Sequence, residues 1–87
     1  MTEDNDGKRF LSNRKKAYQR TFNQECIDAK AVLADLAKFC RAQETTFDAD
    51  PRIHALLEGR KEVWLRIQHH LNLTDEQLWS YYTRKVI

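Results

Sequence analysis

Residues 26–40 read CIDAKAVLADLAKFC, and this stretch decides the fold class. Its apolar residues recur every three or four positions, a spacing that places side chains on one face of an α-helix. Lys30, Asp35 and Lys38 lie away from that face. The pattern predicts a helix over residues 23–42, with a core-facing stripe made of Phe22, Cys26, Ala29, Leu33, Leu36, Ala37 and Cys40.

The chain outward from this stretch carries helix signals and no strand signal. Gly occurs twice and Pro once, and no β-branched alternating run is present. A first helix is expected from residue 8 or 12 to residue 22. Thr74 and Gln77 have the spacing of a capping box, which predicts a last helix beginning there. We therefore expect an all-α fold, a compact bundle of three to four short helices.

A third helix is expected from Pro51 to about residue 71, because Asp50 is a good N-cap and proline suits the first helical position. Ala55 and Gly59, four positions apart, would let another helix approach closely. Arg60 projects into the apolar stripe, where either a salt bridge or an interface role would explain it. The predicted core stripe consists of Ile53, Leu56, Leu57, Trp64, Ile67 and Leu71.

Length and composition bound the organisation. Eighty-seven residues make one domain. We expect a flexible, basic-ended N-terminal tail over residues 1–13 and a single helical domain over 14–87. The acidic N-terminus does not resemble a signal peptide, and no apolar run is long enough to cross a bilayer. Cys26 and Cys40 are expected to stay reduced and unpaired.

The sequence offers no catalytic or metal-binding motif, so we expect no enzyme activity, metal or cofactor. The metal-ligand candidates Cys26, Cys40, His54, His69 and His70 lack the spacing of a zinc site. The two cysteines fall within an apolar stripe, and the adjacent histidines are interpreted as solvated. Asp48 and Asp50 flank a helix start, where capping explains them.

Positive charge gathers at the N-terminus. The net charge is +2, but residues 1–20 hold six bases and three acids. Such a segment either binds phosphates, docks an acidic protein or forms a solvated face. These bases are candidate nucleic-acid contacts: Lys8, Arg9, Arg14, Lys15, Lys16 and Arg20.

The C-terminal stretch 71–78 has helix-turn-helix spacing and resembles the turn and third-helix start of homeodomains. Arg84 stands where homeodomains place the adenine-reading Asn, which departs from that pattern. Capping and packing explain the stretch without DNA. Arg84 and Lys85 remain the candidate nucleic-acid contacts of this alternative.

Four blocks, in order, resemble a small family of tailed-phage proteins. They are VLADLAKFC at 32–40, TTFD at 45–48, DPR at 50–52 and EGRKEVW at 58–64. The family takes its name from open reading frame nineteen of a Bordetella temperate phage, and the resemblance covers residues 18–79. It implies a phage or prophage origin, among late genes for portal, capsid, tail or packaging proteins. It carries over no catalytic residue.

The leading hypothesis is a non-enzymatic phage accessory protein that binds another phage protein, in the virion or in its assembly and packaging machinery. The predicted contact residues are Phe47, Arg60, Trp64, Leu65 and Trp79. The expected location is the virion or the cytoplasm of the infected bacterium. The alternatives are a nucleic-acid-binding protein and an inhibitor of a host protein, and association with further copies of the chain stays open.

Overall fold

The computed structural model describes residues 2–84, with the side chains of residues 6–83. It contains α1 (Thr2–Thr21), α2 (Ile27–Phe39), α3 (Pro51–Asn72) and α4 (Asp75–Arg84). The described residues form no strand. The predicted all-α bundle is confirmed.

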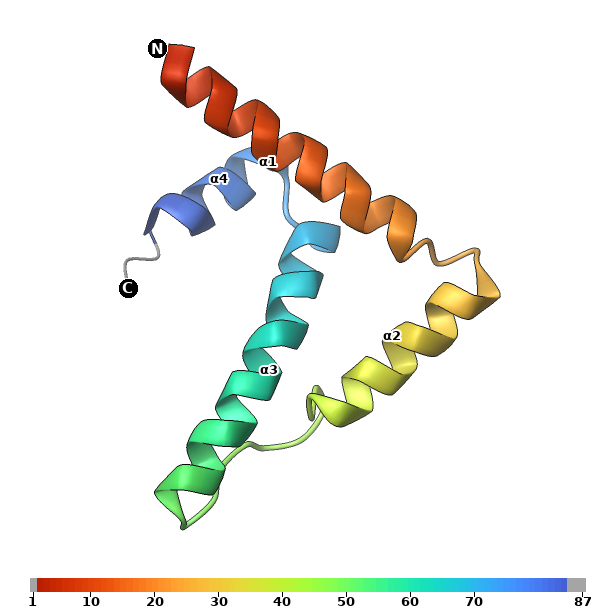
Figure 1. Ribbon diagram of the computed structural model, residues 1–87, viewed down its shortest axis with the longest axis vertical. Coiled ribbons are helices and arrows are strands. Elements are labelled where there is room, and N and C mark those ends of the chain that lie inside the picture. Colours follow the sequence, from red (N-terminus) through yellow and green to blue (C-terminus); the bar gives the residue numbers. More distant parts are fainter. Residues whose placement is uncertain (1, 85–87) are drawn as a thin grey trace.

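The four helices form one flat layer. α1 lies across the C-terminal end of α3 and beside α4, and α2 returns from the end of α1 to contact α3. In Figure 1, α1, α2 and α3 outline a triangle, while α4 lies on the other side of α3. The Cα atoms span 47 × 35 × 14 Å. One layer of helices leaves both of its faces open to solvent or to a partner.

The starts of α3 and α4 are set by capping side chains that were predicted from the sequence. The Asp50 carboxylate accepts the backbone N–H of Arg52 at 2.9 Å, and Pro51 begins α3. At α4, the backbone N–H of Gln77 donates to the Thr74 hydroxyl at 3.1 Å, and the Thr74 N–H donates back to the Gln77 side chain at 3.0 Å. Both predicted caps are confirmed.

α2 is shorter than the predicted helix over 23–42. At its start, the Asn23 side chain accepts the backbone N–H of Glu25 at 2.9 Å, which forms a turn that competes with helix. At its end, Arg41 takes the left-handed conformation (φ 56°) and the N–H of Ala42 reaches back to the Ala37 carbonyl. This arrangement ends the helix, and the residue in the left-handed conformation is usually glycine.

α1 is longer than predicted. It begins at Thr2, so residues 2–13, where we expected a flexible tail, belong to the first helix. The sequence has acidic residues at positions 3, 4 and 6, and negative charge in the first turns of a helix is favoured by the helix dipole. Gly7 then meets α4, since a Cβ atom built at this position would lie 2.9 Å from the Trp79 ring.

The core is small and unevenly distributed. Its buried apolar side chains are Leu11, Ala29, Leu33, Cys40, Leu57, Ile67 and Leu78. The predicted core residues Ile53 and Leu56 are 44% and 54% exposed, and α2 approaches Leu56 only across an open hollow that both helices line. A Cβ at Gly59 would meet nothing within 4 Å, so the close helix crossing expected there is absent from the described part of the chain.

A candidate docking surface

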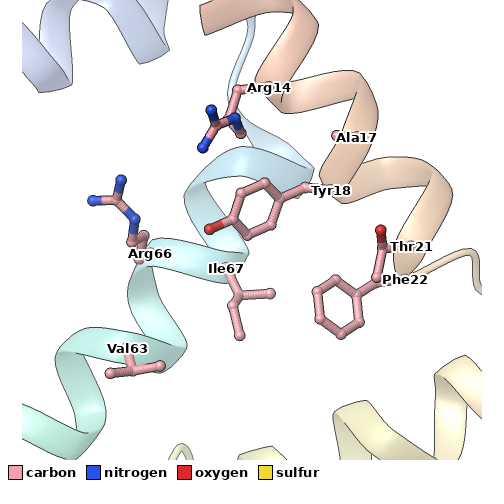
Figure 2. A pocket seen from close by; sticks show the side chains of 8 residues that line it. All are labelled: Arg14, Ala17, Tyr18, Thr21, Phe22, Val63, Arg66 and Ile67. Carbon is pink, nitrogen blue, oxygen red and sulfur yellow. The ribbon is translucent and has the colours of Figure 1, made fainter.

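An apolar hollow of about 390 Å³ lies between α1 and α3. From α1 it is lined by Arg14, Ala17, Tyr18 and Thr21, with Phe22 just beyond that helix, and from α3 by Val63, Arg66 and Ile67. Figure 2 shows the Tyr18 and Phe22 rings extending from α1 toward Ile67 of α3. Val63 is 54% exposed, so the hollow opens to the surface at this end. We call it the α1–α3 hollow.

Two guanidinium groups also line the α1–α3 hollow. In Figure 2 the Arg14 side chain lies above the Tyr18 ring, and the Arg66 side chain lies on the side to which the Tyr18 hydroxyl points. Burial alone would lower the pKa of Arg66, but a hydrogen bond to Tyr18 and the nearby phenol groups outweigh it and raise that pKa. The Arg66 guanidinium also lies 5.4 Å from the centroid of the Tyr82 ring. The hollow therefore combines apolar walls with fixed positive charge.

His70 holds this part of the fold together. Its Nδ1 lies 2.8 Å from the Arg66 carbonyl oxygen, which can only accept, so Nδ1 carries the proton and Nε2 accepts from the Tyr82 hydroxyl at 2.9 Å. The ring stacks on Tyr18 with centroids 4.1 Å apart. His70 is fully buried, so the sequence-based interpretation of a solvated histidine is wrong for this residue.

A second apolar hollow, of about 460 Å³, lies between α2 and α3. Its lining residues are Leu36, Phe39, Cys40, Ala55, Leu56, Gly59, Arg60 and Val63. The Arg60 guanidinium covers the Phe39 ring at 4.3 Å from its centroid. A cation over an aromatic ring therefore accounts for the arginine within the stripe. We call this the α2–α3 hollow; Val63 borders both hollows.

The structure does not bring the five predicted contact residues into one surface. Phe47 is 73% exposed and lies beside His54 on one side of α3, the side that also carries Leu65 at 42% exposure. Arg60 faces α2, and Trp64 is half-buried between these two sides. Trp79 lies at the contact between α4 and α1, against Gly7.

The predicted basic contacts divide into two groups. Lys15 pairs with Asp75 at 3.4 Å, Lys8 lies over the Trp79 ring, and Arg14 lies over the Phe10 ring. Arg9, Lys16 and Arg20 are exposed. They fall within about 40° of one another around α1. Lys85 and the Arg84 side chain lie outside the described residues.

Three side chains that precede Arg84 on the last helix take part in contacts or burial within the chain. The Trp79 ring contacts α1, and the Thr83 hydroxyl donates to the carbonyl of Trp79 at 2.9 Å. Ser80 is half-buried. The turn between α3 and α4 follows the predicted capping box, which agrees with the structural interpretation of this stretch.

The described residues form neither a metal site nor a membrane-spanning helix. Cys26 and Cys40 are free thiols at opposite ends of α2, and no group of three or more His, Cys, Asp or Glu side chains could hold a metal ion. None of the helices described is both long and apolar enough to cross a bilayer.

Sequence reasoning missed the α1–α3 hollow. Val63 and Arg66 lie outside the predicted core stripe of the third helix. A signal was present in α3, where Val63 directly precedes the predicted core residue Trp64 and so widens the apolar stripe. A stripe wider than one neighbour can cover indicates a second contact surface.

One family model matches the chain. Its description is "Bbp19-like phage protein", and the match covers residues 18–81. This range includes the α2–α3 hollow and the α1–α3 hollow from Tyr18 onward, whereas Arg20 is the only one of the six N-terminal bases inside it. No curated protein and no solved structure matches the chain significantly.

Proposed function

Because the chain belongs to the family of Bbp19-like phage proteins, we propose that it is a non-enzymatic accessory protein that binds another phage protein. The partner belongs to the virion or to the machinery that assembles and packages the virion. The protein itself is located in the virion or in the cytoplasm of the infected bacterium. The α1–α3 hollow is the observation that carries this proposal.

Three features of the hollow support protein binding. Its walls are aromatic and aliphatic, it opens to the surface beside Val63, and Arg14 and Arg66 add positive charge to its lining. Aromatic residues and arginine are enriched among the side chains that dominate protein interfaces. His70 stacks on the Tyr18 ring and holds it in place, so the ring is ordered before a partner binds.

The two guanidinium groups define the chemistry of the partner. A segment that inserts one large apolar side chain between Tyr18 and Val63 and presents a carboxylate to Arg14 or Arg66 would satisfy both parts of the hollow. We therefore propose an acidic segment of a phage structural or packaging protein as the ligand.

Ala17→Glu tests this surface. Ala17 lines the hollow and is exposed, so a glutamate there keeps the helix and places a negative charge where the acidic partner would bind. We expect at least about 10-fold weaker capture of the phage partner by this variant, because like charges then meet. Ala31→Glu is the matched control, since Ala31 is an exposed alanine of α2 that lines neither hollow.

The readout is affinity capture from infected cells with the tagged full-length chain, followed by identification of the retained proteins. Capture of a phage-encoded structural or packaging protein by the wild type and by Ala31→Glu, but not by Ala17→Glu, supports the proposal. Absence of the chain from purified virions, together with no such protein retained, contradicts it. Retention of a host protein alone favours host inhibition instead.

A second candidate, nucleic-acid binding, rests on Arg9, Lys16 and Arg20. All three are exposed on one side of α1, and within the described residues none of them forms an ion pair. Three phosphate contacts would give log K a slope of about −2.7 against log salt on duplex DNA. A gel-shift series across salt concentrations should then show this slope, and it should vanish when all three are changed to Gln. Affinity independent of salt excludes this candidate.

A further inference from the structure

The exposed surface of the chain is larger than expected for a monomer of its mass. The chain exposes 6757 Å², whereas a folded monomer of 10.4 kDa exposes about 5,400 Å². Its Cα radius of gyration is 15.2 Å, against about 12 Å expected for 87 residues. The excess surface, about 1,350 Å², is a consequence of the single-layer arrangement.

Part of the uncovered apolar surface lies at the α2–α3 hollow. Phe39, Leu56 and Val63 line it and are each more than half exposed. Beside them, Ala55 and Gly59 form a shallow recess in which nothing approaches a Cβ at Gly59 within 4 Å. Soluble proteins rarely leave an apolar surface of this kind without a partner.

We propose that a second copy of this chain covers the α2–α3 hollow, with α3 of each copy packed against α3 of the other. The excess of about 1,350 Å² per chain falls within the area that obligate homodimers cover on each partner. Two flat layers stacked in this way give the two-layer architecture around one core that domains usually have. The second copy is a different partner from the phage protein proposed above.

The α3 surface is suited to self-association. A two-fold interface uses the same patch on both copies, so the patch must fit itself. Here Ala55 and Gly59 supply a recess, while Leu56 on the same helix and Phe39 of α2 supply side chains to fill it. Among the described residues that line this hollow Arg60 is the only charged one, and its guanidinium already lies over Phe39. Bringing two copies together therefore opposes few like charges.

Gly59→Arg tests the dimer without damage to the single chain. The position is open, and arginine favours helix more than glycine does, so the variant should fold at least as well as the wild type. In the dimer the added side chain would occupy the recess that the second copy needs. We expect the dissociation constant of the dimer to rise at least about 30-fold. Leu65→Arg, about 120° around α3 from Gly59 and lining neither hollow, is the matched control and should stay dimeric.

The measurement is analytical ultracentrifugation of the full chain over a range of concentrations, with circular dichroism to check folding. Wild type and Leu65→Arg should sediment at twice the 10.4 kDa chain mass, and Gly59→Arg at the single mass. A monomeric wild type overturns the proposal, and so does a dimer that survives Gly59→Arg or is lost equally in Leu65→Arg.

The two proposals fail separately. Ala17→Glu should lose the phage partner and remain dimeric, because Ala17 does not line the α2–α3 hollow. A wild type that captures a phage protein as a monomer would retain the proposed function and overturn the dimer. Val63 borders both hollows and is therefore left unchanged in both tests.

Discussion

At the scale of single residues, His70 connects three helices. It belongs to α3, stacks on Tyr18 of α1 and accepts a hydrogen bond from Tyr82 of α4. Burial lowers its pKa below the ordinary value of 6.5; the hydrogen bond to the Arg66 carbonyl opposes this shift, and the Arg66 and Arg14 guanidinium groups reinforce it. The folded protein thus binds a proton on His70 less readily than the unfolded chain does.

This shift predicts lower stability in acid. As pH falls through about 6.5, the unfolded chain takes up a proton on this histidine and the folded chain does not, so the free energy of unfolding decreases until the folded-state pKa is reached. His70→Phe should flatten the pH dependence and, at pH 7.5, cost about 1–3 kcal/mol, since the Tyr82 hydroxyl loses its partner. Urea unfolding between pH 5 and 7.5 measures the pH dependence of the free energy of unfolding and its decrease in the variant. An equal pH slope in wild type and variant contradicts the prediction.

The sequence could not reveal the burial of His70, because burial depends on which helix covers a stripe. His69 and His70 look equivalent in the chain, yet only His70 faces Tyr18. Leu56 shows the converse: it has the spacing of a core residue, but α2 approaches it only across the α2–α3 hollow and leaves it 54% exposed. The helical pattern identifies apolar faces, whereas their partners are set by contacts distant in sequence.

At the scale of elements, the predictable helix ends are those made by local side chains. The Asp50 and Thr74 side chains cap backbone N–H groups no more than three residues away, so the local sequence was enough to predict the starts of α3 and α4. The end of α2 could not be located in this way, because Arg41 takes a left-handed conformation that normally marks glycine. The start of α2 was misplaced because Asn23 forms a turn in which its own side chain takes part.

The start of α2 can be improved. Cys26 occupies the N-cap with extended backbone (φ −92°, ψ 122°), and its side chain makes no cap hydrogen bond. Cys26→Ser should add that bond and raise the free energy of unfolding by about 0.5–1 kcal/mol. Urea unfolding under reducing conditions measures it, and Cys26→Ala, which cannot cap, is the control. Equal stability of the Ser and Ala variants would contradict the role of the cap.

At the scale of the whole molecule, the fold consists of two unequally secured parts. α1, α3 and α4 meet at the cluster of Tyr18, His70 and Tyr82, where ring stacking and hydrogen bonds join all three helices. α2 joins the others by its contact with α3, and it buries only Ala29 and Leu33 within its own length. An element that buries so little apolar surface should separate from the rest before global unfolding.

Native-state hydrogen exchange should detect this difference. Amides in the middle of α2, residues 31–37, should exchange through an opening of lower free energy than those of residues 63–70 in α3, because opening α2 exposes little of the core while opening α3 disrupts the His70 cluster. If a second copy covers the α2–α3 hollow, Gly59→Arg should lower the protection of α2 further and leave that of residues 63–70 closer to the wild type. Identical opening free energies for the two segments would instead show that the four helices unfold as one unit, and that the contact between α2 and α3 is as strong as the aromatic cluster.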